Sequence, residues 1–198
     1  MEIIKENAEQ LVEQLQHAHR ISVAFYRRFL PILDDIANQL GCQFVSWNPL
    51  ETNMGCRSST RPSNKWAWDF VPLFASRHIY WRTEGKIARH QDIGLSLCLY
   101  IDDSFSSEKR EQNKIKGQPD AVTLPMGNAV LQTYVFRPTK NPKKSFADLW
   151  DESDDPELGL EEMQEVCSNM QAIAFEWKLA DVLHNHQQVI DKLKLYIE

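Results

Sequence analysis

The stretch from residue 66 to residue 102 constrains the fold most, because it holds the densest run of β-forming residues in the chain. Aromatic and β-branched residues crowd into it, and both kinds are typical of strands. We predict three strands here, at residues 65–73, 77–83 and 93–102. The last is apolar at nearly every position, which is typical of a central strand covered on both faces.

A long amphipathic helix is expected before this stretch. Apolar or small residues alternate three and four positions apart over residues 4–29, which places them on one helical face. That face consists of Ile4, Ala8, Leu11, Leu15, Ala18, Ser22, Phe25 and Phe29. It suits either a coiled-coil seam or a helix laid on a sheet, and the short repeat with its small residues favours the sheet. Pro31 should break or kink this helix, because proline lacks an N–H donor. A second helix over residues 32–40 should end at Gly41.

The rest of the chain supplies further strands and helices. We predict strands at residues 43–47 and 129–137, a short helix at residues 145–150, an amphipathic helix at residues 163–177 and a last helix from Asn185.

These elements predict an α+β fold in a single domain over residues 1–198. A mostly antiparallel sheet of about five strands would be covered on one face by the N- and C-terminal helices. Residues 103–120 are charged and poor in apolar side chains, so we expect a flexible insertion there.

Composition excludes several classes of function. The chain has 198 residues and a net charge of −6, whereas a general nucleic-acid binder carries excess Lys and Arg. We therefore expect no nucleic acid as partner. No apolar run is long enough to cross a membrane, and the first residues lack the apolar segment of a signal peptide.

The cysteines indicate a reducing compartment. Cys42, Cys56, Cys98 and Cys167 form no CxxC pair, so we expect free thiols and a cytoplasmic location. Cys56 follows Gly55 and precedes Arg57 in a polar loop, and an inert loop cysteine is favoured over a reactive thiolate. Without a glycine-rich phosphate loop or a Cys/His cluster of zinc spacing, the sequence predicts no cofactor and no metal.

The most distinctive charge feature is an acidic segment that starts at residue 148. The predicted partner-binding residues in it are Asp148, Trp150, Asp151, Glu152, Asp154, Asp155 and Glu157. The segment suits a solvated linker that leads into a helix. It also suits a docking site for a basic protein, approached by electrostatic steering and anchored by the tryptophan.

One constellation points to catalysis instead. Asp69 lies in one predicted strand, and Glu84 and Lys86 follow the next, separated by Gly85. This arrangement resembles the PD-(D/E)xK nuclease core. The resemblance implies that the two acids hold Mg²⁺ and that the lysine assists the attacking water. Its alternative is a turn with a solvated Glu–Lys pair.

Two functions follow from these observations. The favoured one is a non-catalytic cytoplasmic binding protein, of the immunity, antitoxin or inhibitor kind, whose acidic surface engages a basic protein. The alternative is a Mg²⁺-dependent nuclease that uses Asp69, Glu84 and Lys86. The nuclease requires the two carboxylates to converge on one cation, with oxygen ligands at roughly 2.0–2.6 Å. The sequence leaves the oligomeric state open.

Overall fold

A computed structural model describes residues 5–53, 58–59, 61–117, 120–121, 123–140 and 142–197. It confirms the α+β fold and the antiparallel sheet, which has six strands in the order β1-β2-β3-β4-β6-β5. The strands are β1 (Gln43–Pro49), β2 (Ala75–Arg82), β3 (Ile93–Tyr100), β4 (Val130–Pro138), β5 (Gln164–Cys167) and β6 (Met170–Lys178). Every neighbouring pair is antiparallel.

Helices precede, interrupt and follow the sheet. The α-helices are α1 (Lys5–Gln39), α2 (Ser107–Gln112), α3 (Phe146–Glu152), α4 (Leu179–His184) and α5 (Gln187–Lys194). The 3₁₀ helices are η1 (Pro62–Asn64), η2 (Ala67–Phe70), η3 (Pro72–Phe74) and η4 (Asp103–Phe105). Among the helices that the structure describes, none is apolar over a length that would cross a lipid bilayer.

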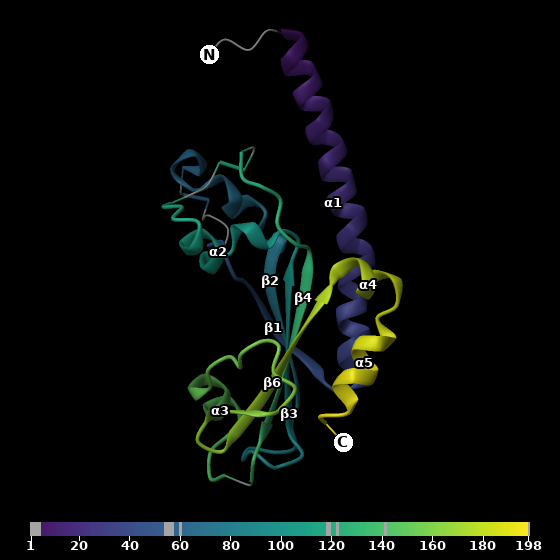
Figure 1. Cartoon of the computed structure of the whole chain (residues 1–198), viewed down its shortest axis with the longest axis vertical. Coiled ribbons are helices and arrows are strands. Elements are labelled where there is room, and N and C mark those ends of the chain that lie inside the picture. The colour runs from purple at the N-terminus through teal and green to yellow at the C-terminus, as the bar shows by residue number, and fades with distance from the viewer. Residues whose placement is uncertain are drawn as a thin grey trace.

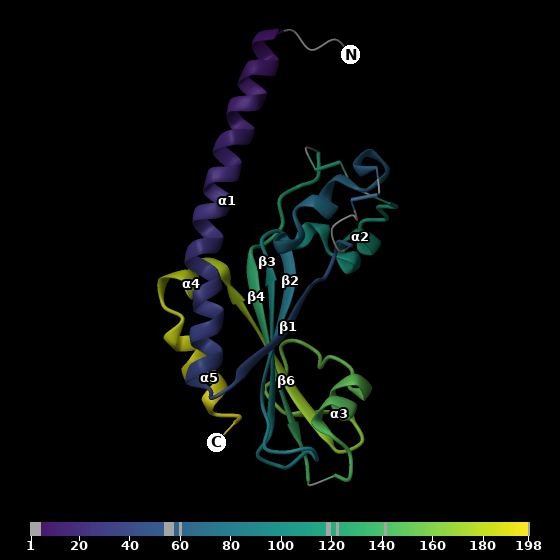
Figure 2. The same ribbon diagram turned by 180° about the vertical axis from the view of Figure 1, so that it is seen from behind.

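One face of the sheet is covered by the second half of α1 together with α4 and α5 (Figure 1 and Figure 2). The buried side chains include Phe29, Leu33 and Ile36 of α1, Leu95 and Leu97 of β3, and Val189, Ile190 and Leu193 of α5. The N- and C-terminal helices therefore share one core, as the sequence predicted.

The opposite face is covered only in part by α3. Phe146 and Leu149 of α3 pack on Phe136 and Ala172 of the sheet, and this second core is smaller than the first. Figure 1 shows α3 near one end of the strands and α2 near the other. The sheet between α2 and α3 carries polar side chains.

The prediction that Pro31 breaks the first helix was wrong. α1 runs through Pro31, and the proline ring is exposed while Leu33, Ile36 and Ala37 are fully buried on the sheet. Burial of these neighbours outweighs the loss of one backbone hydrogen bond. The predicted end at Gly41 is confirmed, since Gly41 has a φ of +75° and its N–H donates to Asn38 O at 2.9 Å.

The strand predicted at residues 65–73 is also wrong. This segment forms the 3₁₀ helices η2 and η3, and β2 begins only at Ala75. Trp68 is buried there against Phe74 and Phe105. The alternation of aromatic residues thus reflects packing within a turn-rich segment, in which Pro72 cannot donate to a sheet.

The amphipathic helix predicted at residues 163–177 is instead the hairpin of β5 and β6. Its turn contains Asn169, whose φ is +76°, a left-handed conformation that asparagine tolerates. Residues 170–175 are buried or half-buried on both faces, so their apolar positions match helical spacing and strand alternation equally well. α4, which follows β6 directly, was not predicted.

Residues 103–120 contain ordered local structure in the part that is described. η4 is capped by the Asp102 side chain, which accepts from Ser104 N, and α2 is capped by Ser106, which accepts from Lys109 N. The flexibility of this insertion stays a prediction.

His78, on the side of the sheet that the helices cover, makes the stability of the folded protein depend on pH. Its side chain is buried, and its Nε2 lies 3.1 Å from Ser76 Oγ. Burial lowers its pKa from 6.5 to about 4, although the negative charge of Asp34 acts to raise it. The unfolded chain therefore binds the proton more tightly than the folded one. The contribution of neutral His78 to the free energy of unfolding should be fully present above pH 6.5. It should be lost as the pH decreases towards 4, by about 2 kcal/mol between pH 7 and pH 5.

A His78→Gln variant should lose this part of the pH dependence. Urea unfolding of both proteins over this pH range measures the difference, and His184→Gln, at an exposed histidine, serves as the control. Parallel pH profiles for the native chain and His78→Gln would contradict the assignment.

Candidate functional site

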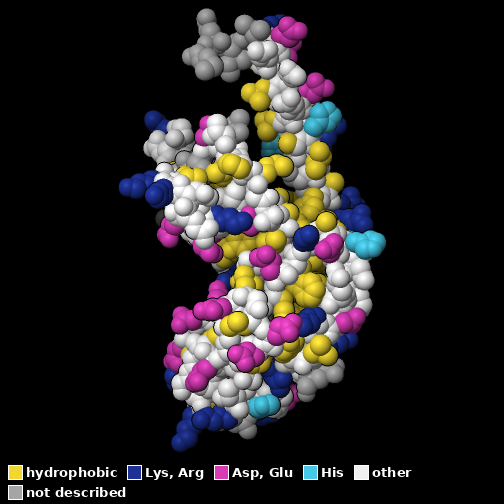
Figure 3. Space-filling model, viewed as in Figure 1, with side chains coloured by type: hydrophobic (Ala, Val, Ile, Leu, Met, Phe, Trp, Pro, Cys, Tyr) yellow, Lys and Arg dark blue, Asp and Glu magenta, His cyan; other side chains and the backbone are white. Residues whose placement is uncertain are grey.

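A polar cleft of about 340 Å³ lies on the sheet between α2 and α3. Its floor comes from four strands and consists of Arg77, Tyr100, Gln132, Tyr134 and Glu176. Residues of η4 and α2 form one wall, and Asp155 and Leu158, between α3 and β5, form the other. Figure 3 shows the hollow, with acidic side chains along its border.

The floor is polar because side chains along a strand point alternately to the two faces of the sheet. In β3, Leu95, Leu97 and Leu99 lie in the core under the helices. The intervening residues Cys98 and Tyr100 face the cleft side. The sequence of β3 thus encodes an apolar face and a more polar one.

Arg77 is the central cation of the floor. Its guanidinium forms an ion pair with Asp155, donates from Nε to Cys98 Sγ at 3.3 Å, and lies 5.9 Å from the centre of the Tyr134 ring. Burial acts to lower the pKa of Arg77, but the contacts of its guanidinium with Cys98 and with the Asp155 carboxylate more than offset this and raise it. Arg77 therefore ties the acidic segment to the sheet.

Three other floor residues form a hydrogen-bonded row. Tyr134 donates to Gln132 Oε1 at 2.9 Å, and Gln132 Nε2 donates to Glu176 Oε2 at 3.0 Å. Burial raises the pKa of the Tyr134 phenol and of the Cys98 thiol, so both stay protonated at neutral pH. This direction is opposite to that of an activated nucleophile, and the floor is suited to binding by hydrogen bonds and charge.

The lining of the cleft is acidic on balance. It contains five carboxylates, from Glu51, Asp103, Glu108, Asp155 and Glu176, and two cations, Arg77 and Lys109. Lys109 pairs with Asp103, and Glu51 pairs with Arg110 at 3.5 Å. Glu108 and Glu176 form no ion pair within the described ranges of the chain. The cleft therefore favours a cationic group.

The predicted partner-binding residues differ in how they are used. Asp151, Asp154 and Glu157 are exposed, and their side chains make no hydrogen bond or ion pair with any residue that the structure describes. Asp155 lines the cleft and holds Arg77. These four carboxylates lie close together in the sequence and leave three negative charges open to solvent.

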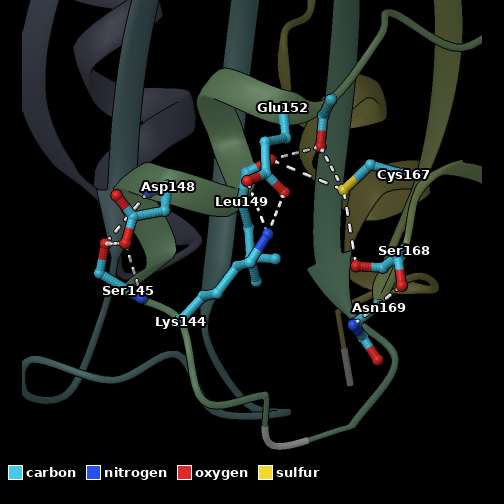
Figure 4. Close-up of polar contacts among 9 residues, drawn as sticks. Lys144, Ser145, Asp148, Leu149, Glu152, Cys167, Ser168 and Asn169 are labelled. Carbon is cyan, nitrogen blue, oxygen red and sulfur yellow. Dashed lines mark hydrogen bonds and ion pairs between the residues drawn. The ribbon is translucent and has the colours of Figure 1, made fainter.

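Asp148 and Glu152 have structural contacts instead (Figure 4). Asp148 forms a capping box with Ser145 at the start of α3, and these hydrogen bonds lower the pKa of Asp148. Glu152 accepts from Lys144 Nζ at 2.6 Å, and this bond raises the pKa of Lys144. Both carboxylates order α3, whatever further contacts they make with a partner.

Trp150 packs on the protein. Its ring contacts Phe136, with centroids 4.6 Å apart, and Trp81, with centroids 5.7 Å apart. Its indole is only half-buried, so one edge remains open to a partner. Its main contacts nevertheless anchor α3 to the sheet.

The structure does not bring the three nuclease positions together. Asp69 lies before β2, where it is buried and accepts from Asn53 N at 3.0 Å. Glu84 and Lys86 lie beyond the other end of β2, a separation of roughly 25 Å for a strand of this length. Glu84 pairs there with Arg89. Asp69 and Glu84 therefore cannot share one cation.

Metal ligands and cysteines add no second site within the described ranges. No group of three His, Cys, Asp or Glu side chains that could hold a metal occurs among these residues. Cys42, Cys98 and Cys167 are free thiols. Cys56 lies outside the described residues.

Comparison with known proteins gives a family. A family model described as PM0109 matches residues 5–197, nearly the whole chain. The chain belongs to the PM0109 family. No curated protein and no solved structure matches it.

Sequence reasoning missed the floor of the cleft in this PM0109 family member. Arg77, Gln132, Tyr134 and Glu176 lie far apart in the sequence, and only the pairing of β2, β3, β4 and β6 brings them together. One signal was available, because Cys98 and Tyr100 alternate with leucines in β3. That alternation indicates that the two faces of β3 have different surroundings.

Proposed function

We propose that this PM0109 family member is a cytoplasmic, non-catalytic binding protein that engages a basic protein through its acidic face. The acidic face is defined as Asp151, Asp154 and Glu157 together with the cleft that Asp155, in the same segment, lines. Inhibitors of the immunity or antitoxin kind act in this way, by covering a basic surface of their partner.

One observation carries the proposal: the carboxylates of Asp151, Asp154 and Glu157 are exposed in the same short segment whose Asp155 lines a cleft that is acidic on balance. Like charges gathered in one place raise the local potential, which attracts and orients a cationic surface before contact. The Arg77–Asp155 pair holds this segment against the sheet, so the charges are presented on a fixed support. The free thiols of Cys42, Cys98 and Cys167 support the cytoplasmic location.

A charge-reversal variant tests the proposal. Asp151→Lys, Asp154→Lys and Glu157→Lys together should reduce capture of basic proteins from the native host by about tenfold or more, because oppositely charged surfaces become like-charged. Quantitative pull-down with the native chain and the variant measures this. Capture by the native chain should also fall steeply with added salt.

The matched control reverses three acids on other surfaces. Asp181→Lys, Asp191→Lys and Glu84→Lys give the same net charge but leave the acidic face unchanged, so capture should persist. Equal capture by the native chain and the Asp151/Asp154/Glu157 variant would overturn the proposal.

A further inference from the structure

The first half of α1 projects beyond the rest of the molecule (Figure 1) and keeps an apolar face that the chain does not cover. Leu11 and Leu15 are 57% and 55% exposed, and α1 has no fully buried residue before Phe29. The repeat of apolar residues in this half therefore has no role in either core. An exposed, contiguous apolar stripe of this kind marks an interaction surface.

The stripe borders a groove of about 520 Å³ between α1 and residues 70–74. Leu15, Ala18 and Ser22 line one side of the groove, and the other side includes Phe70 and Val71, which are 51% and 50% exposed. A second helix laid along the stripe would also cover these two side chains. The surface is thus shaped for a helix with its own apolar face.

We propose that the occupant is the first half of α1 from a second copy of this chain, in antiparallel orientation. The sizes of the stripe residues favour this orientation. Two antiparallel copies can be aligned so that Leu11 lies opposite the partner's Ser22, and Leu15 opposite the partner's Ala18.

Each layer of this arrangement joins one small and one large side chain. Such layers fill the space between helices evenly. A parallel pair would instead place Ala8, Ala18 and Ser22 opposite themselves and leave gaps, while Leu11 and Leu15 would meet their own copies. Gaps of this kind cost stability, because the side chains lining them lose their packing partners.

The charged residues of α1 allow this pairing but do not select its orientation. Glu6, Glu13, Arg20 and Arg27 lie on the surface of the helix opposite the stripe, so they stay in solvent when a second helix covers the stripe. The preference for the antiparallel pair therefore follows from the sizes of the stripe side chains.

The oligomeric state of the full chain tests the proposal. Sedimentation equilibrium should show a dimer with a dissociation constant of about 1 µM, and Leu11→Glu with Leu15→Glu should weaken it by about 100-fold or more. The matched control, Gln10→Glu with Gln16→Glu, adds the same charge to the outer face of the same helix and should remain dimeric. Circular dichroism should show the sheet intact in both variants, because neither pair of residues lies in a core.

Disulfide trapping tests the orientation. A Leu11→Cys chain mixed with a Ser22→Cys chain should form a crosslinked dimer under mild oxidation. Either variant alone should crosslink no more than the native chain, since two copies of residue 11 would lie roughly 16 Å apart along the helix axis. Crosslinking of each variant with itself would overturn the antiparallel arrangement. A native chain that stays monomeric would contradict the proposal that a second copy of this chain covers the stripe and fills the groove.

Discussion

A Gly94→Leu variant should be destabilised by about 3 kcal/mol or more, because the space beside this glycine is already filled. A Cβ atom at residue 94 would lie 2.8 Å from Trp150 Cε3 and 3.0 Å from Phe146 Cζ, with another ring carbon of Trp150 closer still. Leucine adds three further carbons, so α3 must move off the sheet. Urea unfolding measures the loss of stability.

A second substitution identifies the cause. Trp150→Ala should itself be destabilising, but it removes the ring with which residue 94 collides. The double variant Gly94→Leu/Trp150→Ala should therefore be more stable than the sum of the two single effects allows, by about 1–3 kcal/mol. Strictly additive effects would show that Gly94 is required for a reason other than the seating of Trp150.

A Leu97→Ala variant should lower the free energy of unfolding by about 2–5 kcal/mol. Leu97 is fully buried in β3, in the core shared by α1 and α5, and neighbours on every side hold the cavity open. Thermal or urea unfolding gives the measurement. Leu195→Ala, at a leucine that is 73% exposed, should change stability by less than about 0.5 kcal/mol. Similar losses for the two variants would contradict the assignment of Leu97 to the core.

The sequence predicted the fold class because its central strands carry an unambiguous pattern. The run from Ile93 to Tyr100 is apolar enough to require cover on its helical face, and Gly41 gives a local signal for the end of α1. At Pro31, burial of the neighbouring residues kept α1 continuous, although proline usually interrupts a helix. Local preferences therefore located elements well only where packing agreed with them.

The β5–β6 hairpin was missed because two periodicities coincide there. Met170, Ile173, Ala174 and Trp177 fit a helix, yet the same run alternates between the two cores of the sheet. The first half of β6 is covered on both faces, so apolar residues follow one another there and do not reveal the period of two. Asn169 in the turn was the one local indication of a hairpin.

The candidate site was predicted in part. Charge alone located the acidic segment, and Asp151, Asp154 and Glu157 are exposed as a docking role requires. Sequence could not separate them from Asp148 and Glu152, whose partners are Ser145 and Lys144. Trp150 looked like an anchor for a partner, whereas most of its contacts are with the sheet. Such distinctions depend on contacts between elements, which no local pattern contains.

The shared core of α1 and α5 has a consequence for synthesis on the ribosome. The apolar side of the sheet stays only partly covered until α5 emerges, since Val189, Ile190 and Leu193 complete its cover and His186 pairs with Asp35 of α1 at 2.7 Å. A nascent chain that already contains all six strands still exposes part of this surface to solvent. It must be shielded by chaperones, or by its own early helix, for as long as translation of the last helix takes.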